Sequence, residues 1–168
     1  DLHLIDSMGL KVVPLEVALA EVRQPRISSP IVAISFDDGA VFVYRPVSHM
    51  HSGLNTGFYP ILVKHSRHRK LLRRTQPWLH ATTFVIGSRD AHRQIGGGLG
   101  DECAWIGDTA WSDDWWQAAD RSPLLAVENH SWDHNHPYVE TVVDCPSGDF
   151  LCIDNVDFAE KEIGNTQR

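Results

Sequence analysis

The sequence predicts an α/β fold, in which strands and helices alternate along a single domain of 168 residues. Two observations predict this class. Four apolar runs have the length and composition of strands, at 11–14, 30–36, 80–86 and 124–129. Segments with helical spacing of apolar residues accompany them, which favours a mainly parallel sheet. The ends of such strands are the usual place for catalytic side chains.

The N-terminal elements predict a segment that covers the sheet. Residues 2–8 indicate a short helix that stops at Gly9, and the strand at 11–14 follows. Residues 16–22 place Val17, Leu19 and Val22 at spacings consistent with a helix face. No apolar run approaches the length of about 18 residues that a membrane span needs, and no charged-then-apolar leader precedes the first helix.

The second strand, 30–36, ends at two adjacent acids and a glycine, Asp37, Asp38 and Gly39. Alone, this tripeptide is typical of a turn. The fourth strand, 124–129, is followed by two histidines with three residues between them, His130 and His134. Together, one carboxylate and two imidazoles could hold a divalent metal, and one carboxylate is left over as a base. The combination favours a metal-assisted hydrolase.

These motifs resemble those of the NodB-type polysaccharide deacetylases, the fourth family of carbohydrate esterases. The family's first motif, Thr/Ser-Phe-Asp-Asp-Gly, is matched at 35–39. Its second motif, His-Ser/Thr-x-x-His, is matched by His130, Ser131 and His134. Between them, Ala-Thr-Thr-Phe-Val-Ile-Gly at 81–87 is similar to the family's strand Ala-Thr-Phe-Phe-Val-Ile-Gly.

The resemblance implies a partial or irregular (β/α) barrel and a role for each matched residue. Asp37 matches the general base, whereas Asp38, His130 and His134 match the metal ligands. The implied metal is Zn²⁺, with Co²⁺, Mn²⁺ or Ni²⁺ as alternatives. The implied reaction removes N-acetyl or O-acetyl groups from a polysaccharide, with a metal-bound water as nucleophile. Such substrates favour a secreted or periplasmic location.

The chain departs from the family after the second motif. The family's later motifs supply an arginine beside the base, an Asp/Trp pair and a general acid, yet the only arginine after His134 is Arg168. We therefore expect a domain that is truncated at its C-terminus. Two alternatives stay open: a C–N hydrolase of a small amide on the same scaffold, and a catalytically impaired module that binds metal or sugar.

The stretch 57–74 predicts a helix with apolar spacing at Phe58, Ile61, Leu62 and His65. Its other face is basic, and we interpret it as a solvated face because the net charge of −7 argues against a nucleic-acid partner. The loop that precedes this helix, His49-Met50-His51-Ser52-Gly53, is polar and typical of a turn. At the C-terminus, 154–163 predicts the beginning of another helix.

The stretch 87–120 is interpreted as a long loop, with the glycines at 96–98 and Gly100 forming a flexible connection. Because aromatic rings stack on sugar rings, Trp111 and Trp115 are predicted to contact substrate, with Trp105 and Trp116 as further candidates. In the alternative, Trp115 and Trp116 start a helix and at least one is buried.

Six other side chains receive weaker interpretations. Ser131 is expected to order its loop by hydrogen bonding, and His136 to line that loop. Trp132 is expected to pack beneath the metal loop. The cysteines Cys103, Cys145 and Cys152 contain no metal-binding spacing, and their pairing stays open.

Overall fold

The structure is a computed structural model of the chain and describes residues 1–26, 29–49, 53–67, 76–98, 110–136, 138–139 and 153–166. Several residues of interest lie outside these ranges: Trp105, His51, all three cysteines, and the basic residues Arg69, Lys70, Arg73 and Arg74.

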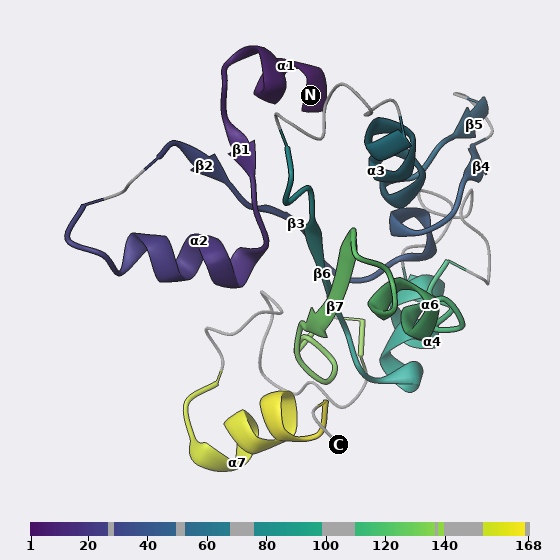
Figure 1. Cartoon of the computed structure of the whole chain (residues 1–168). Coiled ribbons are helices and arrows are strands. Elements are labelled where there is room, and N and C mark those ends of the chain that lie inside the picture. The colour runs from purple at the N-terminus through teal and green to yellow at the C-terminus, as the bar shows by residue number, and fades with distance from the viewer. Residues whose placement is uncertain are drawn as a thin grey trace.

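Three parallel strands form the central sheet (Figure 1). They are β3 (Ile34–Phe36), β6 (Ala81–Val85) and β7 (Leu125–Asn129), in the order β3-β6-β7. Ala81 is in register with Ile34 on one side and with Leu125 on the other. The parallel pairing of the predicted runs is confirmed, and the carboxyl ends of all three strands lie at one edge of the sheet.

The remaining strands of the described residues form two small sheets. β1 (Lys11–Val12) pairs in parallel with β2 (Ile31–Val32), which Ala33 separates from β3. β4 (Val47–His49) and β5 (Gly53–Asn55) pair antiparallel. The prediction of a polar loop at 49–53 is therefore wrong for its two end residues, because His49 and Gly53 pair with each other in the ladder between β4 and β5. In this part of the chain the strands form sheets of two and three, and the irregular barrel stays a prediction.

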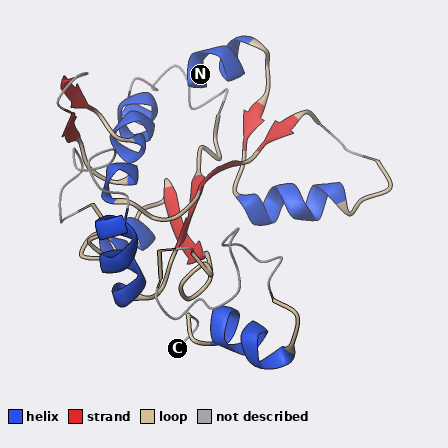
Figure 2. Cartoon of the chain, turned by 180° about the vertical axis from the view of Figure 1, so that it is seen from behind, coloured by secondary structure: helices blue, strands red, loops and turns tan. Residues whose placement is uncertain are grey.

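The helices at 2–8, 16–22 and 154–163 and the described part of the helix at 57–74 are confirmed. The helices are α1 (Leu2–Ser7), α2 (Leu15–Val22), α3 (Phe58–Arg67), α4 (Arg89–Gly98), α6 (Trp116–Asp120) and α7 (Val156–Ala159), and α7 continues into a π-helical turn, η4 (Glu160–Gly164). A single 3-10 turn, η1 (Val41–Val43), follows the first motif. Figures 1 and 2 show α3, α4 and α6 on one side of the central sheet and α2 on the other.

The helix α4 corrects the prediction of a long loop at 87–120. Ser88 precedes the helix, and its Oγ accepts a hydrogen bond from the backbone N–H of Ala91 at 3.1 Å, as an N-cap does. Ala91 and Ile95 lie one helical turn apart and are both buried against Ile86. This burial stabilises the helix despite the glycines in its last turn, which favour a loop on propensity alone.

The core confirms the alternative interpretation of Trp115 and corrects its predicted contact with substrate. Trp115 precedes α6 and is completely buried, together with Val43 and Leu125. Its ring stacks on Tyr44 with centroids 5.4 Å apart, and Tyr44 stacks on Tyr59 in turn at 4.7 Å. A glycan could reach Trp115 only if this core opened.

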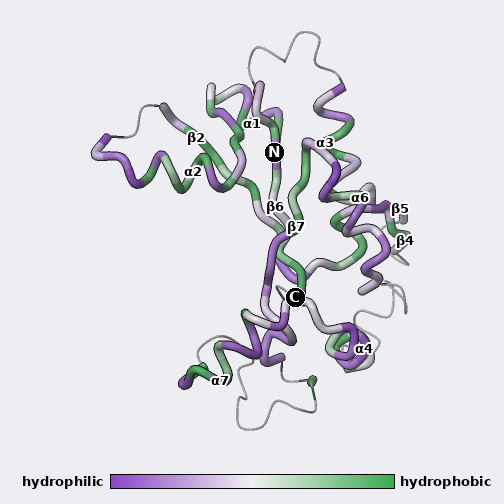
Figure 3. Tube along the Cα trace, turned by 60° about the horizontal axis from the view of Figure 1, so that its bottom comes forward, coloured by the Kyte–Doolittle hydropathy of each residue, from purple (hydrophilic) through white to green (hydrophobic). Residues whose placement is uncertain are grey.

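The helix α2 buries none of its side chains. Its Val17, Leu19 and Val22 side chains are exposed, although their spacing is that of a packed face. Figure 3 shows hydrophobic and hydrophilic residues alternating along α2, away from the central strands. None of the helices in the described ranges is both long enough and apolar enough to cross a membrane.

Candidate metal centre

The two sequence motifs meet at the carboxyl edge of the central sheet. Asp38 follows β3 and His130 follows β7, and the end of β6 lies between them. Ile86 donates a backbone hydrogen bond to the carbonyl of Asp38 at 3.3 Å, and His130 donates one to the carbonyl of Val85 at 2.9 Å. The end of β6 therefore positions both motifs relative to each other.

Gly39 allows the first motif to turn tightly against β6. It has a φ of +79°, and a Cβ at this position would lie 2.6 Å from Cγ1 of Val85. Asp38 itself has a φ of 68°, a left-handed conformation that is uncommon outside glycine and costs free energy. The surrounding contacts hold this strained turn so that the Asp38 carboxylate faces the second motif.

The triad Asp38, His130 and His134 has the geometry of a metal site. One donor atom from each residue lies within 4.8 Å of the others. Nε2 of His130 is 3.3 Å from Oδ1 of Asp38, and the two imidazole rings have centroids 4.7 Å apart. Donors placed about 2.0–2.1 Å from a tetrahedral zinc ion are themselves separated by roughly 3.3 Å. The side chains therefore fit Zn²⁺ or a similar first-row ion.

The electrostatics of the triad favour the ionised carboxylate. A hydrogen bond from His130 holds the pKa of Asp38 below its ordinary value of 3.8, although burial acts in the opposite direction. In the same loop as His134, burial of the His136 side chain and the proximity of His134 lower the pKa of His136. An ionised carboxylate and neutral imidazoles are the forms that bind metals.

The loop that carries His134 is held in an uncommon conformation. Ser131, His134 and Asn135 have φ values of 80°, 63° and 44°. The backbone N–H of Ser131 donates to Oδ1 of Asn129, and the backbone carbonyl of Ser131 accepts a hydrogen bond from the N–H of Gly87 at 2.9 Å. The hydroxyl of Ser131 is buried and has no hydrogen-bond partner among the described residues, so the backbone of Ser131 rather than its side chain orders the loop.

The C-terminal segment contacts the same loop through Asp133. The Asp133 carboxylate lies 2.5 Å from Nζ of Lys161, and its backbone N–H donates to Glu162 at 3.1 Å. Burial raises the pKa of Glu162. Burial alone would lower the pKa of Lys161, yet the hydrogen bond to Asp133 and the attraction of both acids raise it. Neither Lys161 nor Glu162 was singled out in the sequence, because only the fold brings them under the motif.

Asp37 precedes the triad and its side chain is exposed. The structure places His136 beside the triad rather than in it, with its ring 6.5 Å from that of His134. Trp111 is partly buried against His92, with ring centroids 5.6 Å apart, and lines a small hollow with Arg89 and Asp113. None of the triad lines that hollow, so the structure does not bring Trp111 together with the ligands.

A larger hollow lies next to the second motif. It has a volume of about 450 Å³ and is lined by Asn129 and Trp132 of that segment, by Gly87, and by Thr166 of the C-terminal segment. Trp132 therefore borders open space, and its expected packing beneath the metal loop stays a prediction. The motif's own tryptophan is a better placed aromatic side chain for a substrate than Trp115.

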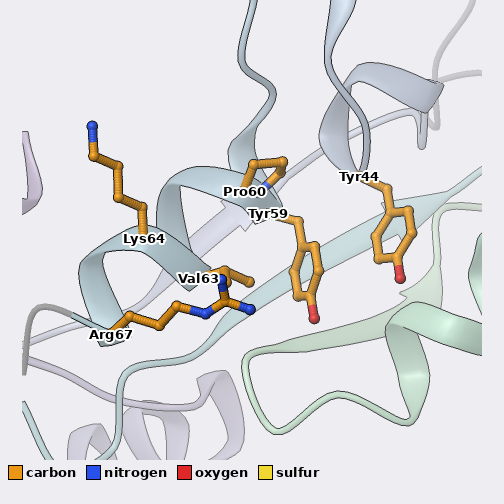
Figure 4. Close-up of a pocket in the computed structure, with 6 residues that line it drawn as sticks. All are labelled: Tyr44, Tyr59, Pro60, Val63, Lys64 and Arg67. Atoms are coloured by element: carbon orange, nitrogen blue, oxygen red, sulfur yellow. The ribbon is translucent and has the colours of Figure 1, made fainter.

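A third hollow lies over α3, at a distance in sequence from both motifs. Figure 4 shows Tyr44 and Tyr59 side by side in it, with the basic residues Lys64 and Arg67 on the same helix. Its volume is about 460 Å³, and no ligand of the triad lines it.

Comparisons of the chain with protein-family models, with curated proteins and with solved structures gave no match.

Proposed function

We propose that this chain is a metal-dependent hydrolase that removes N-acetyl or O-acetyl groups from a polysaccharide. The observation that supports the proposal is the meeting of Asp38, His130 and His134 at the ends of two parallel strands, with Asp37 preceding Asp38 in the sequence. Three protein ligands leave a coordination position open, as catalytic zinc sites do. The motif resemblance adds the class of substrate.

In this proposal each acid of the first motif has a separate task. Asp38, His130 and His134 would hold Zn²⁺, which when bound lowers the pKa of water and polarises an acyl carbonyl. Asp37 takes the proton of the attacking water as general base. Its exposed position is compatible with that task, because a base must reach the water and the substrate. As the tetrahedral adduct collapses, the proton held by Asp37 passes to the leaving nitrogen or oxygen, so that acetate is released and a free amine or hydroxyl remains.

The hollow beside the second motif is the proposed place for the sugar chain because of its position next to that motif; none of the three ligands lines it. Trp132 lines it, and the flat face of an indole suits the C–H face of a sugar ring. A secreted or periplasmic location belongs to the same proposal, because such polymers lie in or near the cell envelope.

One observation favours the second candidate, a module that binds metal or sugar without turnover. Three arginines of the described residues, Arg45, Arg89 and Arg93, pair with acids other than Asp37. Arg45 lies 2.7 Å from Asp114, and Arg89 lies 2.6 Å from Asp113. A base without an orienting arginine is less well positioned for catalysis.

Substitution of Asp37 by Asn separates the two candidates. We expect Asp37→Asn to retain its bound zinc and to lower acetate release from chitohexaose by about 10²–10⁴-fold, the usual contribution of a general base. Asp120→Asn, at an exposed acid that ends α6, is the matched control and should release acetate at the wild-type rate.

Two results would point elsewhere. Unchanged acetate release by Asp37→Asn would remove the base role. Binding of chitohexaose by the wild-type chain with zinc present but no release of acetate would favour the binding module. A panel of monomeric amides tests the small-amide hydrolase, which would act on those amides and leave the oligosaccharide intact.

A further inference from the structure

A second group of metal-binding side chains lies between α1 and α3, outside the proposed active site. His3 and Asp6 are three positions apart on α1 and therefore share one face of that helix. His65 comes from the last turn of α3 and is buried. One donor atom of each lies within 4.8 Å of the others, as in the triad.

The distance between Asp6 and His65 matches the separation of two ligands in a tetrahedral site. Nε2 of His65 is 3.1 Å from Oδ2 of Asp6, close to the separation of roughly 3.3 Å between ligands of one zinc ion. The ring of His3 meets that of His65 edge to face, with centroids 5.1 Å apart. An ion pair would explain why Asp6 and His65 lie together, but it would not explain why the imidazole of His3 lies beside them.

A buried glutamine orients the carboxylate of this group. Nε2 of Gln76 donates to Oδ1 of Asp6 at 2.7 Å and to the carbonyl of Leu10 at 2.6 Å. Oε1 of Gln76 accepts from the backbone N–H of Val12 at 2.6 Å. The amide is thus held from both sides, and it leaves Oδ2 of Asp6 directed at His65. A hydrogen bond to the second oxygen of a ligating carboxylate is the usual support around a metal.

Open space lies on the other side of the group. A hollow of about 260 Å³ is lined by His3 and His65 together with Thr56, Ile61 and Lys64. A metal held by three protein ligands needs a fourth, and this hollow can supply water. Lys64 and Asp1, residues of opposite charge, border the same space.

We propose that His3, Asp6 and His65 form a second site for a divalent transition metal, with Zn²⁺ as the ion that suits two imidazoles and one carboxylate. The ion would join α1 to α3 and thereby fix the N-terminal segment on the domain. The site is independent of the proposed deacetylase activity.

The test uses a chain in which the triad is disabled by Asp38→Asn and His130→Ala. We expect this chain to bind one equivalent of Zn²⁺ in a calorimetric titration, and to bind Co²⁺ with the visible absorption of a tetrahedral site. Adding His3→Ala should weaken Zn²⁺ binding by more than about 10-fold, because loss of a direct ligand costs at least as much as loss of a supporting contact. The control is Leu4→Ala, an exposed neighbour on α1 that should leave binding unchanged.

A second variant tests the orienting role of Gln76. Gln76→Leu in the same chain should weaken Zn²⁺ binding by roughly 10–100-fold. Because His3 is exposed, its removal should not unfold the domain, so circular dichroism of the His3→Ala chain should be unchanged. The proposal is overturned if the triad-disabled chain binds no Zn²⁺, or if His3→Ala binds it as tightly as its parent.

Discussion

The molecule holds two groups of one aspartate and two histidines that differ in how the fold presents them. In the first, Asp38, His130 and His134 lie on loops at strand ends, and the Asp38 side chain is 52% exposed. In the second, His3, Asp6 and His65 lie on helix faces; the side chains of Asp6 and His65 are only 12% and 4% exposed. The exposed member is thus the carboxylate in the first group and a histidine, His3, in the second.

The two groups also differ in the backbone that carries them. The first depends on left-handed residues and on a close approach of Gly39 to β6. The second needs only helical periodicity and one buried amide, Gln76. Strained backbone is retained where a site requires it, whereas a structural site can be built on regular elements. This contrast agrees with the proposed roles, an active site for the first group and a structural site for the second.

The largest difference should follow substitution of one glycine near each group. Gly39→Ala introduces a Cβ 2.6 Å from Val85 at a φ of +79°, and we expect it to cost about 3 kcal/mol of unfolding free energy from strain and overpacking together. Gly9→Ala, which follows α1 at a φ of +71° with nothing within 4 Å, should cost about 1 kcal/mol. Urea unfolding measures both, and equal costs would mean that contact with Val85 is unimportant.

An intermediate effect is expected for the ion pair beneath the second motif. Lys161→Met leaves the buried Asp133 carboxylate uncompensated, which should cost about 2 kcal/mol, less than a fully buried pair because Lys161 is 30% exposed. The matched control is Arg93→Met, which removes a pair with Asp90 whose side chains are 75% and 72% exposed and should cost under about 0.5 kcal/mol.

The same variant should discriminate between the two metal groups. Because Asp133 lies in the loop that carries His134, Lys161→Met should weaken zinc binding at the triad and leave binding by His3, Asp6 and His65 unchanged. Equal weakening at both sites, measured by titration of chains with one group disabled, would contradict the separation of the two sites.

The smallest effect is a dependence of stability on pH through Asp38. Its pKa lies below 3.8 in the folded chain, so it contributes stability above that pH and loses the contribution as the pH falls through the lowered pKa. In metal-free protein, Asp38→Asn should therefore lower the free energy of unfolding above pH 3.8. Because Asp38 is half-exposed, the decrease should be less than about 1 kcal/mol, and it should become smaller as the pH falls below 3.8. An effect of the substitution that grew as the pH fell would contradict this account.

The first group could be predicted from sequence because its signals are local. Two acids and a glycine end one strand and a spaced pair of histidines follows another, and parallel strands bring such ends to one edge. The fold class followed from the same runs. The helix α4 could not be predicted as easily, because the glycines at 96–98 outweigh the cap at Ser88 and the spacing of Ala91 and Ile95.

The second group could not be predicted because its signal is tertiary. Helical spacing placed His65 on the apolar face of its helix, which is most often the position of a core histidine. Nothing in the sequence indicates that α1 faces that histidine, or that Gln76 lies between α1 and β1. Likewise, the substrate contact expected of Trp115 was wrong because its burial depends on packing against Tyr44 and Leu125.

The most direct test of the account is Co²⁺ binding by the triad, measured in a chain that carries His3→Ala so that the second group does not contribute. We expect one equivalent of Co²⁺ to bind, and His134→Ala to weaken binding by on the order of 100-fold or more. The control is His136→Ala in the same loop, which lies outside the triad and should change the affinity by only a few-fold. If His134→Ala bound Co²⁺ as tightly as its parent, the triad would not be a metal site and the proposed hydrolase would lose its foundation.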